Sequence, residues 1–354
     1  MSEKPFDQLK CRASSDWGNI SNARSASYDT LKKLQALEFF PETDSNDPNL
    51  NVQIVVNGSL ARGEWTSGSD VDWHLLVDGP ANPQHLKLAQ GIGSLIETHF
   101  PRPNPSGAFG KMSSSHELMH WIGGPNDSNE NLTRRMLLLL ESFAIPEPAN
   151  RIVLDRVTKH VLRRYIDLDP SVSRLNSTEP IIPRFLLNDV VRYWRTIAVD
   201  YAAKKWEYSG KWALRNAKLR MSRKMIFAKG LLMCLKCASL PDRPTPKEMD
   251  AAVIQHCEDY AAISAIDVMA RHLLEVSNID LAKKLFDAYD GFLSVIDDEG
   301  KRKELAELDF HSAEKNSIFQ AVRDYGRVFQ SGLSQLFFDE DNGLAELTKE
   351  YGVF

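Results

Sequence analysis

This sequence of 354 residues has few cysteines, no long apolar run and no excess of positive charge. Four cysteines are too few at this length for the disulfide framework of a secreted domain. The longest apolar runs, at 136–140 and 230–235, are too short to cross a bilayer, and the first six residues contain no apolar signal core. We therefore expect a cytoplasmic protein without a membrane segment.

The charge balance argues against a general attraction to nucleic acid. The chain carries 43 Lys and Arg against 48 Asp and Glu, a net charge of -5. A local basic patch would survive that average, so long nucleic acid is only weakly disfavoured as a partner. With 43% hydrophobic and 26% charged residues, the chain has the composition of a globular protein that can bury a sizeable core.

Cys234 and Cys237 have the CxxC spacing of some zinc and redox sites. They lie in an apolar run with helical periodicity, and neither a second CxxC nor a His pair is near them in the sequence. We predict that they are buried helix thiols.

One segment points directly to chemistry. An apolar strand at 52–56 is followed by Gly58 and Ser59, a short helical segment, and a second strand that carries Asp70 and Asp72. Because strand side chains alternate, both acids point to one face with Cα atoms about 6.5–7 Å apart, which suits two carboxylates that share metal ions. Gly58 lets the backbone approach a ligand closely, and the amide and hydroxyl of Ser59 can hold phosphate oxygens at a helix start.

The Gly58-Ser59 pair, ten intervening residues and then Asp70-Val71-Asp72 in an apolar strand resemble the signature of the DNA polymerase β-like nucleotidyltransferase superfamily. The resemblance implies an α/β (α+β) domain with a small mixed sheet that transfers an NMP from an NTP and releases pyrophosphate. It also implies that Asp70 and Asp72 hold Mg²⁺ or Mn²⁺, and we expect ATP as the nucleotide. Acceptors in the superfamily include small hydroxyl compounds such as aminoglycosides, protein side chains and tRNA ends, and the sequence does not choose among them.

Three further residues near this motif are candidates. Arg62 is placed to pair with a β- or γ-phosphate, the alternative being a solvated arginine. Active members of the superfamily often add a third acid from a neighbouring strand, and Glu117, in an expected strand at 115–122, is the candidate catalytic and metal-binding acid; a surface glutamate is the alternative. His74 shares the strand face of the acids, as a substrate contact or a packed, hydrogen-bonded histidine.

The chain divides into two predicted domains. Strand signals fade after residue 169, while apolar spacings of three and four residues persist. We place the boundary in the Ser- and Pro-rich segment 169–183, which gives a nucleotidyltransferase domain at 1–170 and an all-helical domain at 171–354. The helices expected in the second domain are 185–206, 213–237, 246–276, 279–296 and 317–337.

The expected helix 213–237 carries a cluster of basic residues. Helical spacing puts Arg215 and Lys218 on one side of it. The resemblance implies that the triphosphate lies between the catalytic domain and basic groups of a helical domain, so these two residues are candidate phosphate ligands. A solvated or ion-paired helix face is the alternative.

Two other functions stay open. His116, Glu117 and His120 match the HExxH pattern of zinc metallopeptidases, with Glu141 on a predicted helix as a third ligand. That function needs a helix where the nucleotidyltransferase interpretation places a strand. The other alternative is a catalytically inactive module that binds nucleotide for regulation, which the ambiguous third acid permits.

Overall fold

The computed structural model describes residues 4–39, 51–101, 109–145, 152–172, 179–207, 210–339 and 343–352, with the backbone alone at 205–207. The strands are β1 (Val52–Val56), β2 (Trp73–Val77), β3 (Lys111–Ser114) and β4 (Phe143–Ile145). The earlier helices are α1 (Pro5–Ala13), α2 (Gly18–Gln35), α3 (Gly58–Arg62), α4 (Gln84–His99), α5 (Ser115–His120), α6 (Asn129–Leu140) and α7 (Ile152–Asp167). The later ones are α8 (Arg184–Glu207), α9 (Trp212–Lys218), the π-helical turn η1 (Leu219–Arg223), α10 (Lys224–Leu235), η2 (Lys236–Ser239), α11 (Pro246–Ala261), α12 (Ala265–Glu275), α13 (Ile279–Asp297), α14 (Glu299–Glu307), η3 (Phe310–Lys315), α15 (Ser317–Phe338), α16 (Ala345–Leu347) and η5 (Thr348–Gly352).

The described strands form one small mixed sheet in the order β3-β2-β1-β4. Strand β1 is antiparallel to both β2 and β4, and β3 runs parallel to β2 after the crossover through α4. In the β1–β2 pairing, Val55 lies opposite His74. This sheet and the many helices that follow it confirm the predicted fold class.

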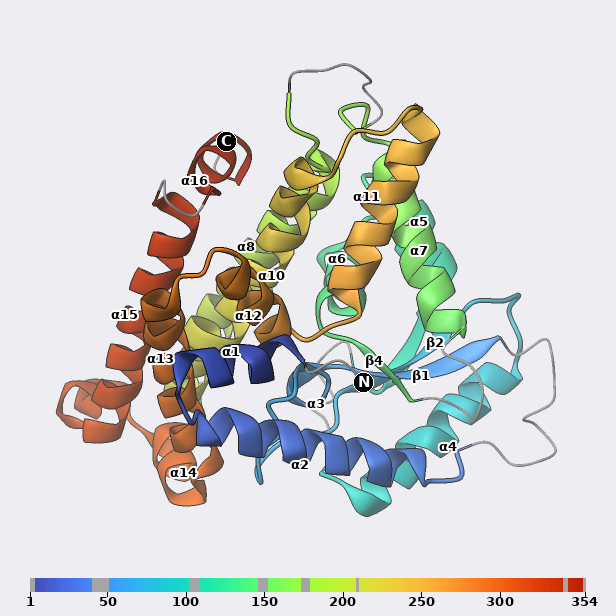
Figure 1. The fold of residues 1–354 in the computed structure, drawn as a ribbon. Helices are drawn as coiled ribbons and strands as arrows, with labels where there is room; N and C mark the ends of the chain where they lie inside the picture. The colour runs from blue at the N-terminus through green and yellow to red at the C-terminus, as the bar shows by residue number, and fades with distance from the viewer. Residues whose placement is uncertain are drawn as a thin grey trace.

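Alternate residues of the central strands belong to two cores. Ile54 and Leu75 pack on one face with α2 and α4, whereas Val55 and Leu76 join the larger core that continues through α6, α7 and the later helices. Figure 1 shows α2 and α4 on one side of the sheet and α6 and α7 on the other. Since strand side chains alternate, Asp72 lies on the face of the larger core.

The chain after residue 184 is helical, as the apolar spacings predict. Two of the expected helices are interrupted. The predicted helix 213–237 contains the π-helical turn η1. The predicted helix 246–276 is two helices, because Ser264 is the N-cap of a new helix, α12, and its hydroxyl accepts a hydrogen bond from the Asp267 amide.

Two local predictions are wrong, and one strand was not expected. The segment 115–122 is not a strand, because β3 ends at Ser114 and α5 follows it, so Glu117 lies on a helix. Strand β4 was not expected, since three residues are too few to show an alternation. Asp70 and Asp72 lie just before β2 rather than within it, although the Asn57 amide donates to the Asp72 carbonyl at 2.8 Å and continues the pairing.

The first helices pack against the last ones. Helix α1 contacts α12 and α13, and α2 contacts α13. The indole of Trp17 donates to Asp287 at 2.7 Å, and the amide of Ile20 donates to Asp290 at 2.9 Å. These contacts tie residues 5–35 to the helical part, and the division at residue 170 stays a prediction.

Cys234 and Cys237 are fully buried free thiols, which confirms that prediction, and burial raises the pKa of both. Over the part of the chain that the structure describes, every helix is too short or too polar to span a membrane. The cytoplasmic location stays a prediction.

A buried arginine joins three helices, α6, α7 and α8. Arg135 of α6 is fully buried and donates to Asp127 at 2.8 Å, to Asp189 of α8 at 2.7 Å and to the hydroxyl of Tyr165 of α7 at 2.7 Å. Burial by itself would raise the pKa of Asp127, but the hydrogen bonds and charge of Arg135 hold that pKa below its usual value.

We expect Arg135→Met to lower the free energy of unfolding by about 3–5 kcal/mol, because two acids lose their buried cation and keep a cation only through the longer contacts to the more exposed Arg192. Urea denaturation measures this loss. Arg327→Met is the control, since Arg327 pairs with Asp324 on the exposed surface of α15 and should change stability little. Equal effects of the two substitutions would contradict the assigned role of Arg135.

Candidate functional site

The turn after β1 touches the second acid of the motif. Gly58 has a φ of 68°, and a Cβ built on it would overlap the Oδ2 atom of Asp72. Both the left-handed backbone and the close approach require glycine here. The structure thus brings Gly58 and Asp72 together, as the motif predicts, with Ser59 in the first turn of α3 beside them.

The two acids repel each other. Burial, followed by the charge of Asp70, raises the pKa of Asp72 to about 7, while the charge of Arg223 opposes that rise. A bound cation relieves such repulsion, and carboxylate oxygens are ligands that Mg²⁺ prefers. The pair therefore fits a divalent cation.

The third acid does not join this pair. Glu117 lies on α5, where its side chain is 37% exposed and 3.8 Å from Arg134. Across the described ranges of the chain, no three His, Cys, Asp or Glu side chains form a group that could hold a metal ion. Glu117 is thus an ion-paired residue at the surface in this structure.

Glu141 lies closer to the acids, since its charge contributes to the raised pKa of Asp72. It follows the last residue of α6 and is buried. One carboxylate oxygen accepts from Nη1 of Arg62, and the other accepts from Nη1 of Arg223 at 2.8 Å. Burial by itself would raise the pKa of Glu141, but these two arginines hold it below its usual value.

The contacts of Glu141 also bear on the zinc peptidase alternative. Helix α5 does place His116 and His120 one turn apart, with ring centroids separated by 4.6 Å. However, Glu141 lies beyond the end of α6, and two arginines occupy both oxygens of the expected third ligand. The HExxH motif therefore lacks the third zinc ligand, Glu141, that the peptidase alternative requires.

Arg62 is buried rather than solvated, with 6% of its surface exposed. Its Nε donates to Glu64 at 3.0 Å and its Nη1 donates to Glu141. Burial would lower the pKa of this guanidinium, but the charges of the two carboxylates raise it above its ordinary value. Arg62 is thus part of a buried ion network, with two of its nitrogens already used.

A cleft of about 550 Å³ lies between β3 and α6 on one side and α8, α9 and η1 on the other. Lys111 and Tyr193 line it, together with Arg215, Lys218 and Arg223. Its volume is in the range of sites that bind small molecules. The cleft adjoins the acid pair, because Asp70 acts electrostatically on Lys218 and Asp72 acts on Arg223.

Arg215 and Lys218 both line this cleft, as their helical spacing predicts. Burial lowers the pKa of Lys218 to about 8, the charge of Arg302 adds to this effect, and Asp70 opposes it. The Nη1 atom of Arg215 is buried without a hydrogen-bond partner among the described residues. Both side chains therefore suit an anionic ligand.

His74 is 4% exposed, which agrees with the packed alternative. Burial and the charge of Arg134 lower its pKa to about 3, so the imidazole is neutral at pH 7.

Three residues that sequence analysis did not place at the site belong to it. Arg223 lines the cleft, and its charge acts on Asp72. Arg302 of α14 donates from Nη1 to the Thr66 hydroxyl at 3.0 Å and from Nη2 to the Gly68 carbonyl. These two contacts anchor the loop before Asp70. The side-chain amide of Asn57 is fully buried, and neither of its polar atoms has a hydrogen-bond partner in the described chain. The only feature of the sequence that could have indicated Asn57 is its place as a polar residue at the end of an apolar strand. No pattern in the sequence indicates Arg302.

Comparison with known proteins agrees with the motif. Residues 37–103 match a family model described as a nucleotidyltransferase domain. The match covers β1, the Gly58 turn, both acids, β2 and α4. No curated protein matches the chain.

We expect Gly58→Ala to lower the free energy of unfolding by more than the roughly 1–2 kcal/mol that left-handed backbone costs a residue with a Cβ, because the new methyl group also displaces Asp72. The control is Gly123→Ala, since Gly123 has a φ of 71° but no atom of the described chain, apart from its sequence neighbours, within 4 Å of where a Cβ would lie. Chemical denaturation of both variants separates the two costs. Equal losses would show that the Gly58–Asp72 contact is not tight.

Proposed function

We propose that this chain, which carries a nucleotidyltransferase domain of the DNA polymerase β-like superfamily at residues 37–103, transfers a nucleoside monophosphate from an NTP to an acceptor. The oxygen of an acceptor hydroxyl attacks the α-phosphorus, forms a new P–O bond and gives up its proton to water. The bond from the α-phosphorus to the oxygen that bridges to the β-phosphate breaks, and pyrophosphate leaves with that electron pair. ATP is the proposed nucleotide.

Asp70 and Asp72 are the proposed ligands of Mg²⁺ or Mn²⁺. A divalent cation held by these two carboxylates would neutralise phosphate charge and orient the α-phosphate. Gly58 leaves room for the Asp72 carboxylate, and the amide and hydroxyl of Ser59 are proposed to hold phosphate oxygens. The observation that carries the proposal is the close contact between Gly58 and Asp72, together with the electrostatic effect of both acids on basic residues that line the cleft.

The triphosphate is proposed to bind Lys218, Arg215 and Arg223. All three line the cleft, and guanidinium and ammonium groups form strong hydrogen bonds to phosphate. An anion would favour the charged form of Lys218, whose pKa burial and the charge of Arg302 lower. The acceptor binds in the remainder of the cleft, and small hydroxyl compounds, protein side chains and tRNA ends stay open as its class.

The first test is pyrophosphate release from each of the four NTPs with Mg²⁺ or Mn²⁺, with cell extract as the source of acceptors. We expect release by the wild type and background levels from the Asp70→Asn, Asp72→Asn double variant. Asp78→Asn is the matched control, since Asp78 follows the other end of β2 and pairs with Arg156. An α-labelled NTP then marks the acceptor.

Full release by the double variant would show that the site is assigned wrongly. Nucleotide binding without release from any NTP would favour the inactive regulatory module. That alternative has one structural observation in its favour, because Glu141, which lies near the acid pair, is neutralised by Arg62 and Arg223.

We expect kcat/KM for the NTP to fall as pH rises through about 8, because the free enzyme loses the charge of Lys218 there. Lys218→Met should raise KM about 10- to 100-fold at pH 7, from the roughly 1.5–3 kcal/mol of a hydrogen bond to a charged group. Lys218→Arg keeps the charge, so its profile should not fall between pH 7 and 9. A fall near pH 8 in the arginine variant would assign the titration to another group.

A further inference from the structure

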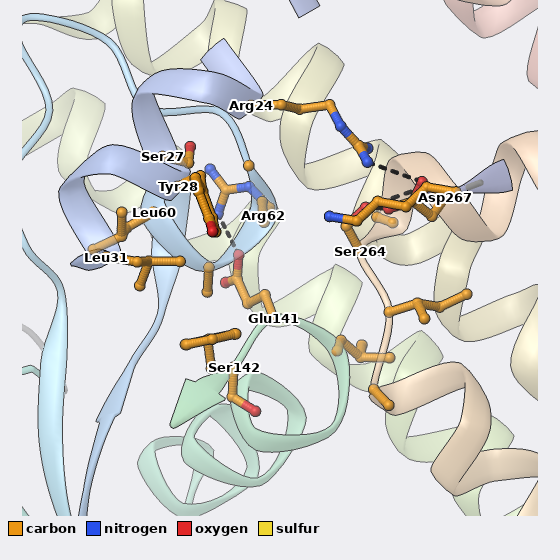
Figure 2. Close-up of a pocket in the computed structure, with 18 of the residues that line it drawn as sticks. Arg24, Ser27, Tyr28, Leu31, Leu60, Arg62, Glu141, Ser142, Ser264 and Asp267 are labelled. Carbon is orange, nitrogen blue, oxygen red and sulfur yellow. Dashed lines mark hydrogen bonds and ion pairs between the residues drawn. The ribbon is translucent and has the colours of Figure 1, made fainter. Parts of the chain in front are cut away.

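A second cavity, of about 360 Å³, lies among α2, α3 and the segment that joins α11 to α12. Figure 2 shows Tyr28 and Leu31 of α2, Leu60 and Arg62 of α3, and Glu141 around it. This cavity is distinct from the cleft. Arg62 and Glu141 line the cavity, whereas Arg223, the other partner of Glu141, lines the cleft.

The wall of this cavity carries an excess of positive charge. Its acids are Glu141 and Asp267, and both are already paired, Glu141 with two arginines and Asp267 with Arg24 at 3.1 Å. Its cations are Lys4, Arg24, Lys32, Arg62 and Lys229. An anion is therefore favoured in the cavity over a neutral or cationic ligand.

Two of these basic residues have neither an acidic partner nor a hydrogen-bonded carbonyl for their ammonium among the described residues. Lys229 is not one of them, because its ammonium donates to the carbonyls of Leu140 and Ile263, at 2.9 and 2.8 Å. Lys4 and Lys32, in contrast, form no ion pair with any acid of the described residues. The Nη2 atom of Arg62 is also left over from the contacts to Glu64 and Glu141.

An aromatic side chain, Tyr28, lies beside Lys32 in the cavity wall. Tyr28 is 59% exposed although it lines the cavity, and the ammonium of Lys32 lies 4.3 Å from the centroid of its ring. Leu31 and Leu60 add apolar surface beside Tyr28 (Figure 2). Because the ammonium covers one face of the Tyr28 ring, a flat ring can stack on the other face while an anionic group reaches Lys32 at the ring edge.

We infer that this cavity is a second ligand site, which binds a mononucleotide with its base on Tyr28 and its phosphate at Lys32 and Lys4. A volume of about 360 Å³ is near the lower end of small-molecule sites, which suits a mononucleotide. The site is separate from the proposed transfer reaction and does not depend on it. Its ligand would contact Arg62, and through Glu141 this arginine is tied to Arg223 in the cleft.

The test is equilibrium binding of AMP and UMP to the full chain by calorimetry, with inorganic phosphate as a second probe and no NTP or divalent cation present. Tyr28→Ala should weaken AMP binding about tenfold or more, the loss expected for a stacked base. Lys32→Ala should weaken it by a similar factor. Lys33→Ala is the matched control, because Lys33 is the exposed neighbour of Lys32 on α2 but does not line the cavity.

The Lys218→Met variant distinguishes this site from the cleft. We expect it to keep the AMP binding that Tyr28→Ala removes, whatever its transfer activity. Three results would overturn the proposal. The first is no mononucleotide binding by the wild type at millimolar concentration, and the second is equal affinities for AMP and inorganic phosphate. The third is unchanged affinity in a Tyr28→Ala, Lys32→Ala double variant that keeps the wild-type circular dichroism spectrum. Loss of AMP binding in Lys218→Met alone would assign it to the cleft instead.

Discussion

One buried carboxylate, that of Glu141, joins the motif region to the helices that face it. It accepts hydrogen bonds from Arg62 at the end of α3 and from Arg223 at the end of η1. Removing one partner from such a buried network leaves another charge uncompensated, so the three groups hold one another in place. Arg62 follows the Gly58 turn and Arg223 lines the cleft, so this network sets how the cleft faces the turn.

The network continues into the last part of the chain. Arg62 also binds Glu64, and Glu64 accepts from the hydroxyl of Tyr289 on α13. A little further along, Arg302 of α14 holds the loop at Thr66. The loop that carries Asp70 is therefore positioned by helices near the end of the sequence.

Charges of one sign gather on each side of the site. Burial and then the charge of Asp70 raise the pKa of Asp72, while burial and the charge of Arg302 lower the pKa of Lys218. Each repulsion destabilises the protein without a ligand and is relieved by a partner of the opposite charge. A cation between the acids and an anion at Lys218 fit this pattern together, and a metal-bound nucleotide supplies both.

Much of the site follows from local sequence. The strand β1, the close approach of the backbone at Gly58 and the strand that follows the acids depend on neighbours in the chain, so the motif predicts them. The helical second half follows in the same way from its apolar spacing. The prediction for Glu117 is wrong about its element, because a short apolar run at 115–122 fits a helix as well as a strand.

The sequence by itself determined the turn, the acid pair and the helices, because backbone geometry and side-chain periodicity act over a few residues. Only the tertiary structure decided which charges meet. Glu141 and Arg223 are 82 residues apart, and Thr66 and Arg302 are 236 apart. No local pattern specifies such pairs, since they form only when packing of the core brings distant helices together and buried charges must then find partners.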